Sequence, residues 1–387
     1  MEVFDFFLPT KIKLGTGLFS KAGQFVKETV TGNKILLVTD PGIEQLGIVD
    51  TLLSSLENED FQTKVFNGVR PNPKDTDCMN GAEVARQFEA DVILAIGGGS
   101  VIDSAKAIAI LQVLGGKPQD YAGRNKVPTG VTPLVVIPTT AGTGAEVTRS
   151  SVITDTTQKT KFTIKDVHIA PVLAIVDPEL TYKLPKSLTA STGMDALVHA
   201  IEAFTCKLSN PIADGLALQA MKHIYPHLRT AVHEGTNKEA RYQVMIGSTI
   251  AGMAFSHADV ASVHCMAEAI GGLYDTPHGV ANSMFLPYIV EFNAEADITK
   301  HAMIARTIGI SSEKDTDEEA TAKLVIEMKQ LAQDLSIPTF SSLPEVKEED
   351  FEYLAQSSFL NGSTPSNARE ITTEDYLELF KKAYKNE

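Results

Sequence analysis

Short runs of apolar, often β-branched residues recur through the first half of the chain, each close to a turn signal. They occupy residues 35–39, 62–66, 92–96, 134–137 and 173–176. The runs show little alternation of apolar and polar positions, and segments of helical character separate them. This arrangement is typical of parallel strands in a sheet that is covered on both faces. The pattern therefore predicts an α/β domain with a parallel sheet.

The spacing of apolar residues changes after about residue 186, where helical periodicity dominates and no convincing strand follows. One apolar face comprises Met194, Leu197, Ala200, Ile201 and Phe204, and another comprises Leu324, Ile326, Met328, Leu331 and Leu335. A chain of 387 residues also exceeds what one hydrophobic core usually covers. We therefore expect an α/β domain over residues 1–182 and an all-helical domain over residues 183–387.

Charge and cysteine content exclude several classes of function. The sequence has 34 basic and 49 acidic residues, a net charge of −15, which disfavours nucleic acids and anionic membranes as partners. The three cysteines (Cys78, Cys206 and Cys265) form no C-x-x-C pair, so neither a disulfide framework nor a thiolate metal site is expected. The N-terminus lacks the basic start of a signal peptide, and no apolar run approaches membrane-spanning length. We expect a cytoplasmic protein.

Two turns rich in glycine, serine and threonine follow neighbouring predicted strands. Gly97–Ser100 lies between an apolar strand and a helical segment, where free N–H groups and the positive helix end favour a phosphate. The second turn, at residues 137–146, contains Thr139, Thr140 and Thr143. Either could be an ordinary tight turn, but the pair is better explained by a cofactor that carries a diphosphate.

The glycine turn differs from the Rossmann fingerprint, because the G-x-G-x-x-G spacing is absent. The candidate acid for a ribose, Asp40, precedes the glycines at the end of the first apolar run. Its carboxylate would accept hydrogen bonds from ribose hydroxyls and repel a 2′-phosphate, which would favour NAD over NADP. The alternative is a turn aspartate in the sequence Asp-Pro-Gly.

Three histidines and one aspartate form a candidate metal site. Asp195 and His199 are four residues apart in a helix predicted over residues 192–204, so they share a face. His264 lies in a second helix predicted over about residues 259–270, and His278 follows in a predicted loop. One carboxylate and three imidazoles suit Fe²⁺ or Zn²⁺, although most individual histidines are surface or hydrogen-bonded core residues.

Three segments together resemble the iron-containing (group III) alcohol dehydrogenases: GGGSVIDSAK (97–106), TGMDALVHAIE (192–202) and VHCMAEAIGGLYDTPHGVAN (263–282). The resemblance covers nearly the whole chain in the same order. It implies a dinucleotide-binding domain followed by a helical metal domain, NAD(H) and one divalent metal (Fe²⁺, or else Zn²⁺), an alcohol or aldehyde as substrate, and at least a dimer. It implies Asp195, His199, His264 and His278 as metal ligands. It implies cofactor contacts at Asp40, Asn72, Gly98, Gly99, Ser100, Thr139, Thr140, Thr143 and Lys161.

The chain departs from relatives near His264. Relatives often have a second histidine four residues later, where this sequence has Glu268. We assign catalytic roles to Glu268 and His278; Glu268 would relay protons, join the metal's shell or bind substrate, unless it is a buried acid paired with a cation. Phe255, His257, Asp259 and Glu268 are our candidates for the substrate pocket, although Phe255 could simply pack in the core and Asp259 could cap the helix.

The polar candidates for the substrate pocket, His257, Asp259 and Glu268, favour a diol, an amino-alcohol or another small polar alcohol as substrate. Near the C-terminus, Asn367 or Arg369 could instead reach the site, and an arginine would favour an acid-bearing alcohol. Three competing functions stay open at this point: an NAD- and metal-using lyase of the 3-dehydroquinate synthase type, a polyol oxidation like that of glycerol dehydrogenase, and a non-catalytic NAD-binding or scaffolding protein. Net oxidation of NADH with an aldehyde would separate a dehydrogenase from the lyase and from the non-catalytic protein.

Overall fold

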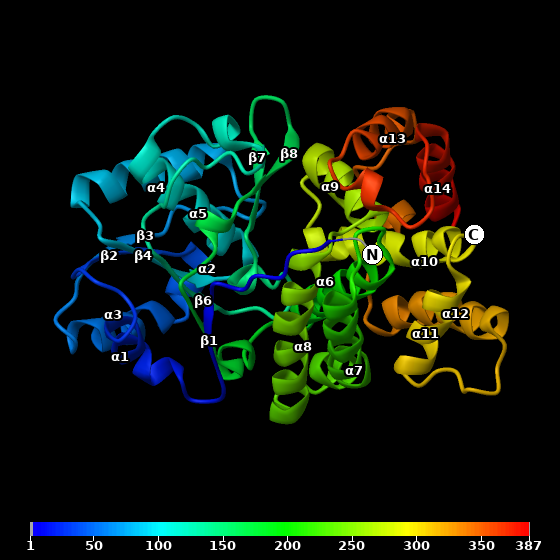
Figure 1. Ribbon diagram of the computed structural model, residues 1–387, viewed down its shortest axis with the longest axis horizontal. Coiled ribbons are helices and arrows are strands. Elements are labelled where there is room, and N and C mark those ends of the chain that lie inside the picture. The colour runs from blue at the N-terminus through cyan, green and yellow to red at the C-terminus, as the bar shows by residue number, and fades with distance from the viewer. Residues whose placement is uncertain (1–2, 387) are drawn as a thin grey trace. The chain divides into compact units, whose positions relative to one another are not determined.

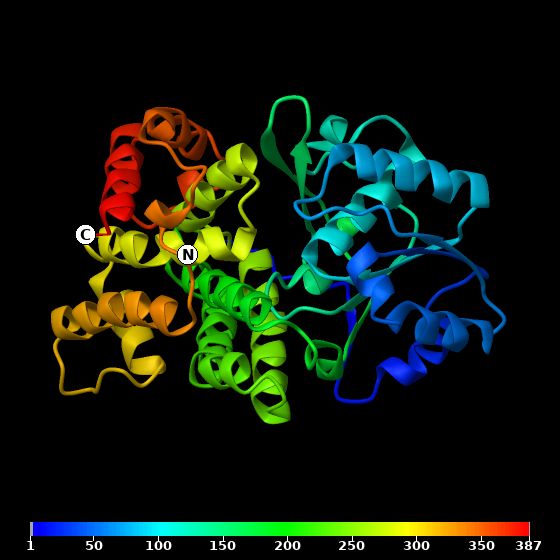
Figure 2. The ribbon, with the colours of Figure 1, turned by 180° about the vertical axis from the view of Figure 1, so that it is seen from behind.

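The structure, a computed structural model, describes residues 3–386 (Figures 1 and 2). Its contacts divide the described chain into two compact units. One unit comprises residues 8–140 and 144–182, and the other comprises residues 3–7, 141–143 and 183–386. Within the described residues, no helix is both long and apolar enough to cross a membrane.

The first unit is built on a six-stranded sheet in which every strand pairing is parallel. In spatial order the strands are β1 (Lys11–Leu14), β9 (Leu173–Val176), β6 (Leu134–Pro138), β4 (Val92–Gly97), β2 (Lys34–Val38) and β3 (Gln62–Phe66). All five predicted strands are therefore confirmed, together with the predicted class of sheet.

Helices cover this sheet, and apolar side chains fill the layer between them. They are α1 (Ala22–Lys27), α2 (Pro41–Gln45), α3 (Ile48–Glu57), α4 (Asp75–Phe88) and α5 (Gly99–Leu114). On one face, Ile35 and Leu37 of β2 and Leu94 of β4 belong to the same buried cluster as Leu52 and Leu56 of α3. Because the central strands are buried on both faces, they read as continuous apolar runs in the sequence.

The sequence analysis missed one strand of the sheet and a smaller sheet beside it. β1 has alternating lysines and lies at the sheet edge, so it lacks the apolar run of the central strands. The second sheet is three-stranded, in the order β5 (Gly123–Arg124), β8 (Thr160–Lys165) and β7 (Ser150–Asp155). β8 is mostly half-exposed and rich in lysine and threonine, which explains why its sequence resembles a loop.

The second unit is helical, and the structure places no strand among its described residues. Its helices are α6 (Lys186–Thr205), α7 (Pro211–His233), α8 (Lys238–His257), α9 (Ser262–Tyr274), α10 (His278–Ala294), α11 (Ile298–Thr307), α12 (Asp317–Asp334), α13 (Phe351–Phe359) and α14 (Thr373–Lys385). α6 packs against α7, α8 and α10 and is buried over nearly its whole surface from Thr189 onward. It is the central helix of the unit.

Three local predictions in the helical unit were wrong. The helix that carries His264 begins at Ser262 and continues through Gly271 and Gly272, which were expected to end it. His278 is the first residue of α10 and does not lie in a loop. Ile326 was assigned to the apolar face of α12 but is 67% exposed, because the residue lies off the stripe formed by Leu324, Met328, Leu331 and Leu335.

Candidate metal and cofactor sites

The four side chains predicted to bind a metal lie together in the helical unit. α6 provides Asp195 and His199, α9 provides His264, and α10 provides His278. One potential ligand atom from each residue lies within 4.8 Å of all the others. Asp195, His199 and His264 are almost completely buried, whereas His278 is half-buried. Three helices that are distant in sequence therefore converge on one small polar cluster.

The contacts inside this cluster fit a divalent cation. Nε2 of His264 lies 3.0 Å from Nε2 of His199, and Nε2 of His278 lies 3.7 Å from Oδ1 of Asp195. His264 directs its other ring nitrogen, Nδ1, at the carboxylate of Glu202, so its Nε2 presents a lone pair to the cluster. Imidazole lone pairs and a buried carboxylate that face one point are the donors that Fe²⁺ and Zn²⁺ take.

Asn282 is a member of this cluster that the sequence analysis did not identify. Its Nδ2 donates to Oδ1 of Asp195 at 2.7 Å and lies 3.2 Å from Nε2 of both His264 and His278. The residue follows His278 by four positions in α10, so both side chains lie on one face of that helix, which the sequence analysis had taken for a loop at His278. Nothing in the sequence, however, showed that this face would meet α6.

Burial and mutual charge set the protonation of these groups. Desolvation lowers the pKa of His199 to about 4, which favours its neutral, metal-binding form. Burial alone would raise the pKa of Asp195, but the neighbouring histidines lower it on balance. Burial likewise opposes a charge on His264, yet the carboxylate of Glu202 raises the pKa of that ring.

Two of the predicted substrate-pocket residues lie on α8. The ring of Phe255 stacks on the ring of His199, with centroids 4.3 Å apart, so Phe255 lies directly against the metal cluster. Both ring nitrogens of His257 contact main-chain oxygens, those of Met253 and Phe7, at 2.7 and 2.9 Å. These contacts favour a structural role for His257 over the predicted role in a pocket.

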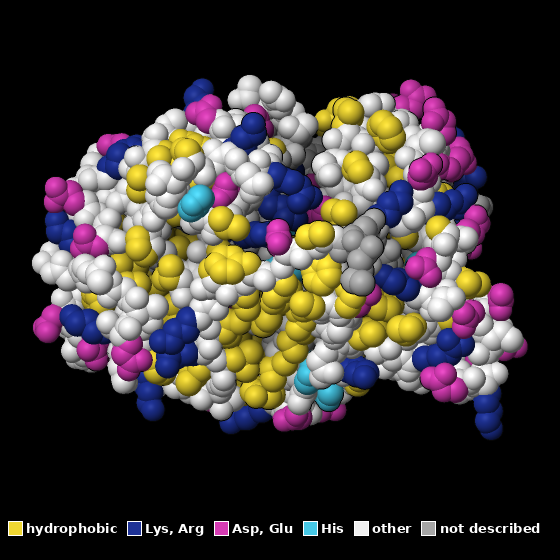
Figure 3. Space-filling view, in the orientation of Figure 1, with side chains coloured by type: hydrophobic (Ala, Val, Ile, Leu, Met, Phe, Trp, Pro, Cys, Tyr) yellow, Lys and Arg dark blue, Asp and Glu magenta, His cyan; other side chains and the backbone are white. Residues whose placement is uncertain are grey.

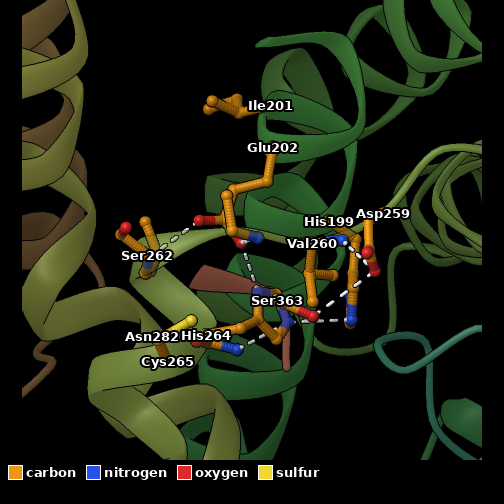
Figure 4. Close-up of polar contacts among 12 residues, drawn as sticks. His199, Ile201, Glu202, Asp259, Val260, Ser262, His264, Cys265, Asn282 and Ser363 are labelled. Atoms are coloured by element: carbon orange, nitrogen blue, oxygen red, sulfur yellow. Dashed lines mark hydrogen bonds and ion pairs between the residues drawn. The ribbon is translucent and has the colours of Figure 1, made fainter. Parts of the chain in front are cut away.

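Asp259 does not cap α9, contrary to one of our two expectations for it. The N-cap residue is Ala261, and the buried carboxylate of Asp259 instead accepts a hydrogen bond from the Ser366 hydroxyl at 2.9 Å. A longer contact, 3.4 Å, joins it to the Ser363 hydroxyl (Figure 4). Asp259 therefore holds the segment that precedes α14.

Glu268 lies one helical turn after His264 on α9 and is half-buried. Its Oε2 accepts a hydrogen bond from the side-chain amide of Asn361 at 2.6 Å. This partner is neutral, so the ion pair considered as an alternative for Glu268 is replaced by an amide contact. The amide fixes the orientation of the carboxylate.

Asn367 and Arg369 are engaged within the helical unit. The amide of Asn367 is buried and exchanges hydrogen bonds with Asn293. The guanidinium of Arg369 forms a 2.8 Å ion pair with Glu295 and lies over the ring of Phe292. Because the charge of Arg369 is already paired, the structure gives no support to an anionic substrate group bound by this arginine.

The predicted phosphate site lies in the α/β unit where β4 ends. Gly98 is the N-cap of α5, and its carbonyl accepts hydrogen bonds from the N–H groups of Val101 and Ile102. Gly99 and Ser100 form the first turn of the helix and are half-buried, as is Gly98. A side chain at Gly97 would collide with Val101, so only glycine permits this tight turn. The arrangement suits an anion at the helix N-terminus.

The threonine-rich turn follows β6, next to β4 in the sheet. Thr140 lies close to Gly98, since a Cβ on that glycine would be 3.4 Å from the Thr140 side chain. The hydroxyl oxygen of Thr139 is buried, and the described residues offer it no hydrogen-bond partner. Thr143 belongs by its contacts to the helical unit. A buried hydroxyl without a protein partner is consistent with a site that a ligand completes.

Asp40, Asn72 and Lys161 have defined roles in the α/β unit. Oδ1 of Asp40 accepts the N–H groups of Gly42 and Ile43, which makes it the N-cap of α2; Oδ2 takes part in neither bond. The two predicted roles of Asp40 are therefore compatible, because Oδ1 caps the helix while Oδ2 could accept a hydrogen bond from a ribose hydroxyl. Nζ of Lys161, on β8, donates to Oδ1 of Asn72 at 2.9 Å, so two residues 89 positions apart form one polar pair.

Comparison with known proteins finds relatives that match nearly the whole chain. The family described as iron-containing alcohol dehydrogenase matches residues 9–178, and its C-terminal domain family matches residues 189–384. A 1,3-propanediol dehydrogenase of Citrobacter freundii is 39% identical over 99% of both chains. An NAD-dependent methanol dehydrogenase of Bacillus methanolicus is 37% identical over 98% of this chain and 99% of that protein. The solved structure of a 1,3-propanediol oxidoreductase superimposes with a TM-score of 0.95 at 39% identity, covering 99% of this chain and all of that one.

The fold and the two sites define a metal- and dinucleotide-dependent oxidoreductase with an α/β domain and a helical domain. The chain belongs to the iron-containing alcohol dehydrogenase family. The predicted fold class and the resemblance are both confirmed. The matches do not favour the three competing functions, namely the lyase, the glycerol dehydrogenase type and the non-catalytic protein.

Proposed function

We propose that this protein interconverts a small polar primary alcohol and its aldehyde with NAD(H), using Fe²⁺ held by Asp195, His199, His264 and His278. The observation that carries the proposal is the convergence of these four donor groups within 4.8 Å of one another. In the oxidising direction, alcohol and NAD⁺ give aldehyde, NADH and a proton. The reverse reaction reduces an aldehyde.

When bound, the metal would polarise the substrate oxygen, and the nicotinamide would exchange a hydride with the adjacent carbon. The chain's own residues position them. The hydrogen bond from His264 Nδ1 leaves Nε2 free to bind, and Asn282 fixes the carboxylate of Asp195 by donating to Oδ1. Phe255 stacks on one face of the His199 ring.

For the cofactor, we propose that the turn at Gly98, Gly99 and Ser100 holds the diphosphate at the start of α5, with Thr139, Thr140 and Thr143 as further contacts. Asn72 and Lys161, which are already joined by a hydrogen bond, would add further contacts. Oδ2 of Asp40 would accept from the ribose and select NAD over NADP. Among the relatives, the methanol dehydrogenase is named as NAD-dependent.

For the substrate, we propose a short diol, with Glu268 as the residue that recognises its second hydroxyl. Asn361 holds Oε2 of the carboxylate, which leaves Oε1 to accept a hydrogen bond. A carboxylate one turn from His264 makes the surroundings of the metal cluster polar. Two relatives, 39% and 38% identical, are named 1,3-propanediol dehydrogenases, which agrees with this choice.

Anaerobic reconstitution with Fe²⁺ or Zn²⁺, followed by assays with 1,3-propanediol and 1-butanol, tests both metal and substrate. We expect Fe²⁺ to give the more active enzyme and the diol to have the higher kcat/KM. Glu268→Gln should lower kcat/KM for the diol by roughly tenfold, because a hydrogen bond to a charged group is lost, while the value for 1-butanol changes little. A higher kcat/KM for 1-butanol in the wild type would refute the choice of substrate.

The metal assignment has its own test. His264→Ala should lose bound metal, measured by elemental analysis, together with NADH-linked activity. Normal metal content and activity in this variant would refute the proposed ligand set.

We also propose that the protein forms at least a dimer with a second copy of itself. Four residues of α8 (Tyr242, Ile246, Ile250 and Met253) form a half-exposed apolar stripe at helical spacing. Figure 3 shows apolar side chains gathered over this helix. Light scattering should give a mass of at least twice 41.7 kDa, and Ile250→Glu should yield a monomer. A monomeric wild type would contradict this proposal.

A further inference from the structure

Glu202, which the sequence analysis did not identify, connects two helices at the metal cluster. It lies on α6, seven residues after Asp195 and three after His199, and its side chain is 2% exposed. Its carboxylate accepts three hydrogen bonds, from the N–H groups of Ala261 (3.0 Å) and Val263 (2.7 Å) and from Nδ1 of His264 (2.5 Å). Figure 4 shows the Glu202 side chain directed toward the start of α9.

We propose that Glu202 is a positioning residue for the metal centre, which holds His264 in the tautomer and orientation that a metal requires while it caps α9. The inference rests on the proposed role of His264 as a ligand. Glu202 itself would not touch the metal or the substrate.

The first step of the argument concerns the tautomer of His264. A neutral imidazole has one N–H and one lone pair, and the carboxylate of Glu202 can only accept. The proton of His264 therefore lies on Nδ1, and the lone pair lies on Nε2, which is the ring atom that faces His199. In metalloproteins such a carboxylate partner fixes the ring and raises the basicity of the ligand.

The second step concerns the start of α9. The N-cap residue, Ala261, has no side chain that could accept from the free N–H groups of the first turn. Asp259, the acid nearest in sequence, bonds to Ser366 and Ser363. Glu202 replaces the missing cap from a neighbouring helix, and its negative charge is favourable at the positive end of α9. One carboxylate thus fixes both the helix and the ligand that the helix carries.

A purely structural role as a cap is the alternative, and Glu202→Gln separates the two. Glutamine keeps the length of the side chain and one oxygen that can accept a main-chain N–H, but it removes the negative charge that binds His264. We expect the dissociation constant for Co²⁺ to rise about tenfold to hundredfold in competition with a chelator. The visible spectrum of the Co²⁺ protein should also change, because the ligand geometry is altered.

Asp177 provides a matched control in the α/β unit. It is also a fully buried carboxylate that accepts main-chain N–H groups, those of Gly17, Phe19 and Glu179. Asp177→Asn should lower the thermal midpoint, as Glu202→Gln does, but leave the Co²⁺ affinity and spectrum unchanged. Glu202→Asp, which keeps the charge on a shorter side chain, should bind Co²⁺ more tightly than Glu202→Gln.

The outcomes are distinct. If Glu202→Gln loses stability but keeps wild-type Co²⁺ affinity and spectrum, Glu202 is a cap and the inference is overturned. If Glu202→Gln does not fold, Glu202→Asp decides, because the shorter side chain cannot reach both the start of α9 and His264: a variant that loses stability but keeps wild-type Co²⁺ affinity and spectrum would likewise overturn it. If His264→Ala retains metal, the proposed ligand set is refuted, and this result does not depend on the Glu202 variants.

Discussion

Gly279, at the start of α10, lies so close to Ser191 of α6 that a methyl group on the glycine would overlap the Ser191 carbonyl oxygen. The same methyl would lie 3.3 Å from Cβ of Asp195. Gly279 follows His278 directly, so the close approach of the two helices is also what brings His278 to Asp195.

Gly279→Ala should therefore weaken metal binding. The added methyl group must push α10 away from α6, at a cost of about 1–3 kcal/mol in stability, and it displaces His278 from the cluster. We expect reduced metal content after dialysis and a lower urea midpoint. Gly215→Ala on α7 is the control, because its methyl group meets no atom within 4 Å. That variant should be as stable as the wild type or more so. Equal metal retention in both variants would contradict the account.

Asp40→Asn should reduce the preference for NAD over NADP. The asparagine oxygen can still cap α2 by accepting from Gly42 and Ile43, so the fold is kept. Loss of the charge removes the repulsion of a 2′-phosphate, and we expect the ratio of kcat/KM values for the two cofactors to fall roughly tenfold or more. An unchanged ratio would show that Asp40 serves only as a helix cap.

Lys106→Met should destabilise the α/β unit severely. Lys106 is completely buried in α5 and donates to the carbonyl oxygens of Ala145 and Ser150 and to the hydroxyl of Thr148. Burial lowers the pKa of this lysine to about 8, yet three acceptors and the carboxylate of Asp103 surround it. Methionine would leave these acceptors without their donor, at a cost of about 3–5 kcal/mol, measurable by urea unfolding. Lys34→Met, at an exposed ion pair, should change stability little.

His301 predicts one component of the pH dependence of stability. It is buried in α11, where its Nδ1 contacts the carbonyl of Asp297 at 2.7 Å, and burial lowers its pKa. The unfolded state therefore takes up a proton at a pH of about 6.5, before the folded state does. Stability should fall as pH drops from about 6.5 through the lower folded value. His301→Gln should show a shallower fall of the urea midpoint over this range; an unchanged slope would exclude the contribution.

Much of the fold could be predicted from local patterns. The central strands β2, β4, β6 and β9 are continuous apolar runs because both of their faces are buried, and the run that forms β4 ends at a glycine turn. The hairpin of β7 and β8 was missed because most residues of both strands are polar and β8 is mostly half-exposed. Its position depends on contacts with α5, which no local pattern records: the Ser151 hydroxyl and the Val152 N–H both bond to Asp103.

The candidate site was predictable only in part. The spacing of Asp195 and His199 placed them on one helix face, whereas their meeting with His264 and His278 followed from family resemblance, because it depends on how three helices pack. Glu202 was within reach, since a third polar residue on that face, seven positions after Asp195, is unusual in a helix buried all round. Its function depends on the start of α9, which the sequence places some 60 residues away.

The concentration of function in α6 has a consequence for how this protein can evolve. Asp195, His199 and Glu202 all lie within a stretch of eight consecutive residues of one buried helix. Inserting or deleting a single residue between them would turn the later side chains by about 100° around the helix axis. Because the helix is buried over nearly its whole surface, its neighbours leave little space for side chains displaced in this way. Descendants of this gene can therefore exchange residues within the stretch, but they cannot change its length and keep the enzyme.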